Sequence, residues 1–148
     1  MFLSYKKRKF KIEKAITFKT IGDFELKGDV YRPNAPGLKP AILVVHGGGW
    51  FKKSGDMQSL CKRLARDGFV VFNATYRLAP KHTYPSAVDD LRDALAWLKV
   101  CANKYEIDIN KISGWGYSAG AHLLLLVGLN PEANLKALVC GGTPADFS

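Results

Sequence analysis

Hydrophobic and polar residues alternate along the first third of the chain. The alternation over Lys11–Ile21 and Phe24–Tyr31 is typical of strands with one polar face, and Gly22-Asp23 between them predicts a tight turn. Pro33 is expected to end the pairing of the second strand. We therefore predict two antiparallel strands at the start of the fold.

After these two strands, short apolar runs predict a different kind of sheet. Pro40–Val45 is apolar throughout, which is typical of a strand buried on both faces of a parallel sheet. Further strands of this sheet are predicted at Phe69–Ala74, Lys111–Gly116 and Leu135–Cys140.

Helical periodicity fills the segments between these strands. Met57–Arg66 is amphipathic and is expected to stop at Gly68, whereas Ala119–Leu129 is apolar enough for a buried helix. A third helix starts near Pro85 and has one apolar stripe, formed by Ala87, Leu91, Ala94, Leu95 and Leu98. Strands that alternate with helices at this spacing predict βαβ units, and hence a single α/β domain over residues 1–148.

Composition narrows the class of protein. The chain has 148 residues, 47% apolar and 24% charged, which suits a globular domain and excludes disorder for most of its length. No apolar run approaches the ~18 residues of a membrane span, and no signal-peptide core follows the N-terminus. Cys61, Cys101 and Cys140 are widely spaced, which argues against disulfides and zinc. We predict a cytoplasmic protein with no metal, no cofactor and no membrane contact.

The net charge of +9 is partly concentrated near the N-terminus, where six of the ten residues in Tyr5–Lys14 are Lys or Arg. Such a stretch could bind an anionic partner, which would make the chain a basic binding domain. The alternative is a solvated edge strand whose lysines discourage pairing with other chains. Because no recognised nucleic-acid motif accompanies the stretch, we do not predict nucleic-acid binding.

Three consecutive glycines follow the apolar run Pro40–Val45, in the motif His46-Gly47-Gly48-Gly49-Trp50. Glycine is costly in chain entropy, so three in a row favour a special turn whose backbone N–H groups can point at an anion or a polarised oxygen. A plain glycine-rich turn is the alternative.

A second motif, Gly116-Tyr117-Ser118-Ala119-Gly120, lies between a predicted parallel strand and the apolar helix. This strand, turn and helix are the context of a nucleophile elbow, which holds a serine in a strained conformation with its hydroxyl exposed. Glycine two positions to either side leaves room around the serine. The N–H of Ala119 opens the helix, where it can stabilise a developing oxyanion.

The two motifs, together with Tyr76–Pro80 and Tyr84–Asp90, make the chain resemble the N-terminal half of α/β-hydrolase esterases. The resemblance covers roughly Asp29–Ser148 and is to the hormone-sensitive-lipase type and to bacterial acetyl-ester and feruloyl-ester hydrolases. It implies an α/β-hydrolase sheet, with antiparallel strands followed by parallel βαβ units and with the C-terminal strands missing.

The resemblance also implies a function and a set of site residues. The function is a serine hydrolase that cleaves small or medium carboxylic esters, or amides, through an acyl-serine intermediate. Ser118 would be the nucleophile, and Gly48, Gly49 and Ala119 would donate the oxyanion N–H groups. The remaining motif residues, His46, Gly47, Gly116, Tyr117 and Gly120, would shape the two turns.

The chain departs from this family after the serine. In this fold the triad acid and histidine follow the nucleophile, but no histidine follows His122, and Glu132 and Asp146 are the only later carboxylates. We expect His122 to point into the fold and Glu132 to be a solvated charge. Three explanations are open: the chain is a fragment of an esterase, a shortened relative that has lost activity, or one part of a two-chain enzyme. We prefer the first.

The predicted last strand, Leu135–Cys140, adds an expectation about assembly. It is apolar with a single charge, and the related fold has further strands beyond it. Open apolar edges invite pairing with other chains. We expect a homo-oligomer, or a partner chain that covers this edge, in addition to a small-molecule ester substrate.

Overall fold

In the computed structural model, which describes residues 8–146, strands and helices follow the predicted order. Along the chain the elements are β1 (Phe10–Ile21), β2 (Phe24–Pro33), β3 (Lys39–Val45), α1 (Met57–Asp67), β4 (Val70–Ala74), α2 (Ser86–Val100), α3 (Ala102–Tyr105), β5 (Ile107–Tyr117), α4 (Ala119–Gly128), the 3-10 turn η1 (Pro131–Ala133) and β6 (Leu138–Gly141). The predicted helix stop is confirmed, since Gly68 caps α1 with a left-handed φ of 108°.

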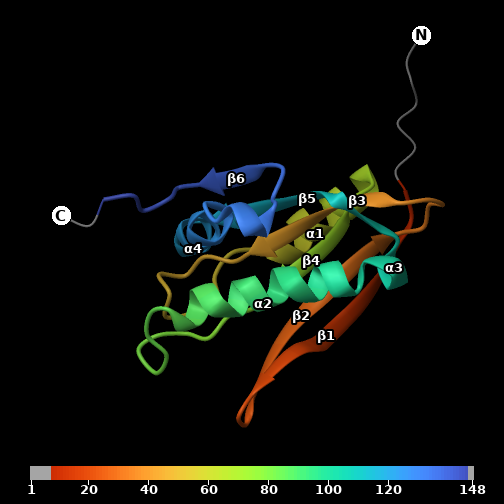
Figure 1. The fold of residues 1–148 in the computed structure, drawn as a ribbon. Coiled ribbons are helices and arrows are strands. Elements are labelled where there is room, and N and C mark those ends of the chain that lie inside the picture. The colour runs from red at the N-terminus through yellow and green to blue at the C-terminus, as the bar shows by residue number, and fades with distance from the viewer. Residues whose placement is uncertain (1–7, 147–148) are drawn as a thin grey trace.

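The strands form one mixed sheet in the order β1-β2-β4-β3-β5-β6 (Figure 1). The hairpin β1–β2 is antiparallel, and β2 also pairs antiparallel with β4. β4, β3, β5 and β6 run parallel to one another. This arrangement confirms the predicted fold class, because crossover helices are what parallel neighbours require.

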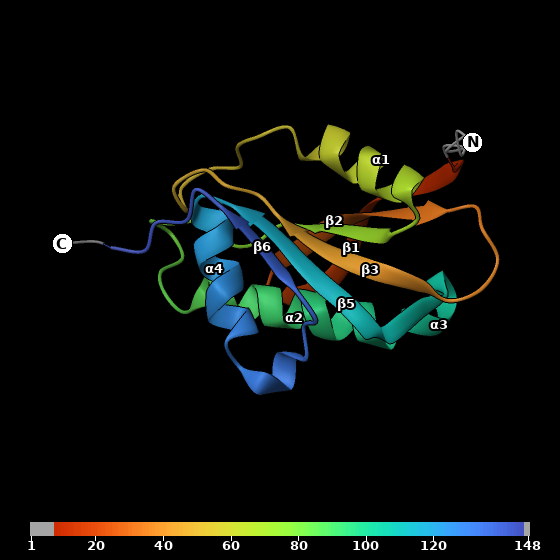
Figure 2. The same cartoon turned by 90° about the horizontal axis from the view of Figure 1, so that it is seen from above.

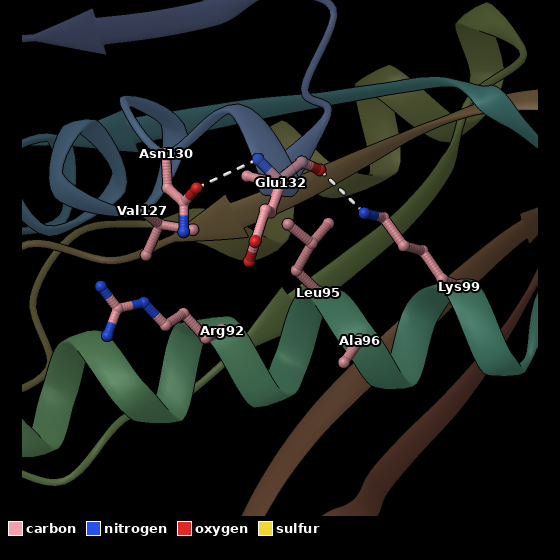
Figure 3. A pocket seen from close by; sticks show the side chains of 8 residues that line it. Arg92, Leu95, Ala96, Lys99, Val127, Asn130 and Glu132 are labelled. Atoms are coloured by element: carbon pink, nitrogen blue, oxygen red, sulfur yellow. Dashed lines mark hydrogen bonds between the residues drawn. The ribbon is translucent and has the colours of Figure 1, made fainter.

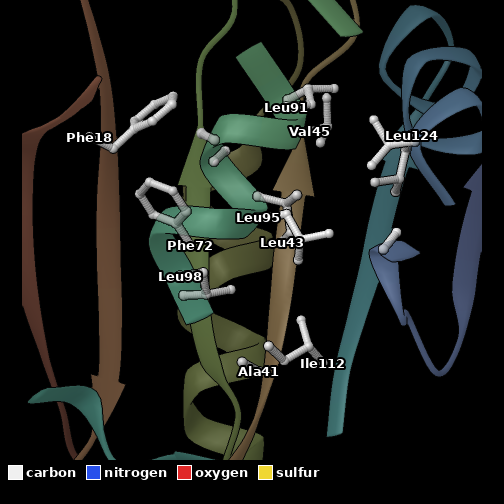
Figure 4. Packing of buried hydrophobic residues seen from close by; sticks show 14 of the residues in the cluster. Phe18, Ala41, Leu43, Val45, Phe72, Leu91, Leu95, Leu98, Ile112 and Leu124 are labelled. Carbon is white, nitrogen blue, oxygen red and sulfur yellow. The ribbon is translucent and has the colours of Figure 1, made fainter. Parts of the chain in front are cut away.

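Helices cover the two faces of the sheet unequally (Figure 2). α1 lies on one face against β2 and β4, over a small apolar cluster that includes Cys61, Val71 and Tyr31. α2 and α4 lie on the other face, over the larger cluster shown in Figure 4, where Phe72 and Leu98 pack between α2 and the strands. The residues of the apolar runs and stripes therefore form the core, as the burial of apolar surface requires.

The structure differs from the predicted elements near the C-terminus. β6 begins at Leu138 rather than Leu135, because η1 and the left-handed Asn134 delay the return of the chain to the sheet. β5 begins at Ile107, before the predicted Lys111, and its register with β3 shifts at that end. In the part of the chain that the structure describes, no helix is both long and apolar enough to cross a membrane.

Candidate active site

The two sequence motifs lie side by side because the strands that precede them are neighbours. β3 and β5 are parallel and paired, with Val45 opposite Gly116 at their carboxyl ends. The glycine loop leaves β3 there and the Ser118 turn leaves β5 there. Ligand sites of open α/β sheets occur at this end of the strands.

Ser118 has the strained backbone expected of a nucleophile elbow. Its φ is 52° and its ψ is −123°, outside the regions that L-residues favour. Its N–H donates to the carbonyl oxygen of Gly141 at 2.8 Å, and its own carbonyl accepts the N–H of His122 at 3.1 Å. The last strand and the first turn of α4 thus hold the serine from both sides.

Three glycines let this turn pack directly on neighbouring backbone. A Cβ on Gly120 would lie 2.5 Å from the carbonyl oxygen of Val45, and one on Gly116 would lie 2.8 Å from the Cα of Ala121. A Cβ on Gly47 would lie 2.9 Å from the carbonyl oxygen of Tyr117. A side chain at Gly47 or Gly120 would push the glycine loop and the serine turn apart, and one at Gly116 would push β5 away from the start of α4.

The glycine loop folds back on itself after β3. Phe51 and Lys52 both donate their N–H groups to the carbonyl oxygen of Gly48 at 3.2 Å, with Gly48 at φ 125° and Gly49 at φ 61°. Within the described residues, the N–H groups of Gly48 and Gly49 donate to no protein acceptor. Ala119 is the first residue of α4, where a helix offers its N–H no internal partner.

His46 supports the loop from inside the fold. Its side chain is buried, its Nδ1 lies 2.8 Å from the carbonyl oxygen of Gly47, and its ring stacks on Tyr76 with centroids 4.3 Å apart. The Tyr76 hydroxyl donates to the carbonyl oxygen of His46 at 3.1 Å. Burial lowers the pKa of His46 and raises that of Tyr76 to about 12, so both rings are neutral around pH 7.

An ion pair fastens the segment after β4 to α2. The Asp90 carboxylate is fully buried and lies 2.8 Å from the guanidinium of Arg77, whose backbone N–H it also accepts at 2.7 Å. Both residues lie in the stretches that contribute to the resemblance, and their contacts give them a structural role. The pair positions Tyr76, and through it the base of the glycine loop.

An open cleft of about 600 Å³ joins the two motifs. It is lined by Gly47, Gly48, Gly49, Phe51, Lys52, Ser54, Gly55, Tyr117 and Ser118. Among the described residues, no histidine and no carboxylate lines this cleft. The patterns in the sequence did not identify Phe51, Lys52 and Ser54, although their position directly after Trp50 was a usable signal.

His122 lies in a separate place, as expected. Its ring meets Trp50 edge-to-face at 5.6 Å and lines a cavity of about 140 Å³ behind the glycine loop, together with Tyr84 and Leu123. The half-buried ring therefore packs against the fold and does not line the Ser118 cleft.

Glu132 is also remote from the serine. It lines a cavity of about 220 Å³ between α2 and η1, opposite Arg92 and Lys99 (Figure 3). Lys99 donates to the carbonyl oxygen of Ala133 at 2.8 Å there, so this cavity belongs to the packing of η1 on α2. The structure thus brings the Ser118 turn and the glycine loop together in one cleft, while Glu132 and His122 line other cavities.

The order of the strands and the serine turn after β5 define the class of α/β-hydrolase esterases. EstE1, a carboxylesterase from a metagenomic library, superposes with a TM-score of 0.81 over 98% of this chain and 51% of that one, at 27% identity. The chain belongs to the BD-FAE family, whose model matches residues 28–141. The predicted resemblance is thereby confirmed.

Curated relatives match at similar levels. The esterase LipC of Mycobacterium tuberculosis is 38% identical over 105 residues, which are 68% of this chain and 26% of LipC. The ethyl acetate hydrolase of Pseudomonas putida is 39% identical over 103 residues, 66% of this chain and 32% of that enzyme. The chain therefore spans about a third or less of the length of these relatives.

Proposed function

We propose that this chain carries the nucleophile and the oxyanion site of a serine-dependent carboxylic ester hydrolase. The observation that carries the proposal is the strained Ser118, in one cleft with Gly48 and Gly49. Backbone strain of this kind has a cost, and it persists in proteins where function requires it.

In the proposed reaction, the Ser118 hydroxyl attacks the ester carbonyl carbon and passes its proton to a base. The N–H groups of Gly48, Gly49 and Ala119 stabilise the resulting oxyanion. The C–O bond to the alcohol then breaks, the alcohol takes the proton, and water later hydrolyses the acyl-serine. We assign the base and its carboxylate to residues outside this chain, because no histidine and no carboxylate among the described residues lines the cleft.

Small or medium acyl esters are the proposed substrates. The cleft is open and its volume suits a small molecule. The ethyl acetate hydrolase among the relatives supports a small acyl group.

Hydrolysis of p-nitrophenyl acetate tests the proposal, because nitrophenolate leaves without needing a proton. We expect slow hydrolysis above the spontaneous rate that disappears in Ser118→Ala. Ser54→Ala is the matched control, since Ser54 lines the same cleft but is not on the elbow, and it should retain the rate. A rate that survives Ser118→Ala would overturn the assignment.

The basic binding domain remains the alternative from a different class. Residues 5–7 of its stretch lie outside the described residues, and Arg8 donates to the carbonyl oxygen of Asp67 at 2.9 Å. Arg8 therefore has a structural contact at the end of α1. Salt-sensitive retention on an anionic resin would support binding instead, if it is unaffected by Ser118→Ala and lost when Lys6, Lys7, Arg8 and Lys9 are neutralised.

A further inference from the structure

The cleft around Ser118 contains a single charged residue. Lys52 is exposed and lines the cleft beside the glycine loop. Its Cγ lies 3.2 Å from the position that a Cβ on Gly48 would take, so its stem runs along the loop that carries the proposed oxyanion donors. No salt bridge within residues 8–146 involves Lys52, which leaves its ammonium available to a ligand.

Neighbouring charges do not cancel this cation. Asp56 is the carboxylate nearest along the chain, and it caps α1 by accepting the N–H of Ser59 at 3.1 Å. Lys53 does not line the cleft, and its charge acts instead on the buried His46, whose pKa it helps to lower. The two adjacent lysines therefore act on different parts of the structure, and of the two only Lys52 lines the cleft.

We propose that Lys52 is a specificity-determining residue that favours esters carrying a carboxylate close to the reacting carbonyl, such as monoesters of dicarboxylic acids. This inference rests on the proposed function, because Lys52 can select only among esters that the cleft binds. A flexible stem lets the ammonium follow a carboxylate on either side of the ester group.

Solvent exposure sets the size of the effect. Exposed ion pairs are weak, so we expect the anionic ester to bind about threefold to fivefold more tightly than its neutral counterpart. Salt should reduce this preference, since it screens exposed charges. The global charge of +9 also attracts anions, which makes a variant with the same net charge the necessary control.

The experiment uses the full chain with Ser118→Ala, which prevents turnover. Monoethyl succinate and diethyl succinate are titrated at neutral pH, and dissociation constants are taken from the amide chemical shifts of Gly48 and Gly49. Lys52→Ala should abolish the preference for the monoester, and Lys52→Arg should restore it. Lys53→Ala removes the same charge one position away and should keep the preference.

Each outcome separates the two proposals. Equal affinity for both esters, or equal loss of the preference in Lys52→Ala and Lys53→Ala, would overturn the role of Lys52 while leaving the ester cleft intact. If neither ester shifts the two glycine amides, the cleft is not an ester site and the proposed function is wrong as well. A preference lost only in Lys52→Ala supports the inference.

Discussion

Ser118 is held in a backbone conformation that costs on the order of 1–3 kcal/mol. Its hydrogen bond to Gly141 and the start of α4 offset this cost by fixing the turn at both ends. The hydroxyl is therefore positioned before any substrate arrives. Positioning alone does not make a serine hydroxyl a strong nucleophile, because its proton must still be removed.

A fluorophosphonate probe should accordingly label Ser118 slowly or not at all. Loss of a triad member typically lowers rates by ~10⁴–10⁶. The rate of any labelling should rise steadily with pH across the neutral range. No described histidine lines the cleft to act as a base that titrates there, and burial lowers the pKa of His46. Intact-mass spectrometry over time measures this rate, and rapid stoichiometric labelling would show that the chain has a base.

Gly120 provides a second prediction for single residues. In Gly120→Ala the new methyl group meets the carbonyl oxygens of Val45 and His46, which are backbone and cannot move aside. We expect a loss of about 2–3 kcal/mol in unfolding free energy. Gly128→Ala in the same helix meets only the side chain of Leu138 and should stay within about 1 kcal/mol of the parent. Urea denaturation compares the two, and equal effects would contradict the prediction.

Sequence patterns located the residues of the two turns but not the walls between them. Ser118 and the three glycines follow from chemistry that requires those residue types at those positions. Lys52 and Phe51 line the cleft because the loop turns back at Gly48, and a φ of 125° cannot be read from a glycine in a sequence. The walls depend on that backbone path, not on composition.

At the scale of elements, the buried pair of Arg77 and Asp90 joins the segment after β4 to α2. Asp90→Asn leaves the guanidinium without its charged partner and should cost about 3 kcal/mol of unfolding free energy. Asp89→Asn is the matched control, because Asp89 pairs with Arg92 on the exposed side of the same helix. That change should cost less than about 0.5 kcal/mol.

Midpoints of urea unfolding decide between the two variants. Similar midpoints for Asp90→Asn and Asp89→Asn would mean that the buried pair does not hold α2 in place. A lower midpoint for Asp90→Asn alone supports the role described for it.

The types of the helices and strands agree with those predicted from the sequence, whereas the starts of β5 and β6 do not. The runs that became β3 and β4 are apolar because both faces of those strands are covered, and that pattern is visible without a structure. The start of β6 depended on η1 and on the left-handed Asn134, which are local turns with no apolar periodicity. α3 was missed for a similar reason, since its one turn is too short to show a period.

At the scale of the whole molecule, one end of the sheet is uncovered. β6 pairs only with β5 among the described strands, and Val139 on β6 is 55% exposed. Tyr117 lies on the same face of the sheet as Val139, because Trp115 pairs with Val139 and residues two apart share a face, and Tyr117 is 52% exposed. Exposed apolar strand edges of this kind promote association.

We therefore predict that the chain self-associates at low micromolar concentration, or requires a partner chain, as sedimentation velocity would measure. Val139→Lys should shift the distribution toward the 16.3 kDa monomer, because lysine discourages pairing at an edge. Val100→Lys, at the exposed end of α2, is the control and should not. A stable monomer in the unmodified chain would contradict the prediction.

The hydrogen bond between Ser118 and Gly141 has a consequence for how the protein is made. Every contact described for the serine turn comes from β3, the glycine loop, α4 or β6, all of which precede Gly142 in the chain. On a ribosome, which releases the N-terminal segments first, these elements can assemble once Gly142 has left the exit tunnel. The nascent polypeptide would then hold its reactive turn fully shaped without a contact from any residue after Gly142.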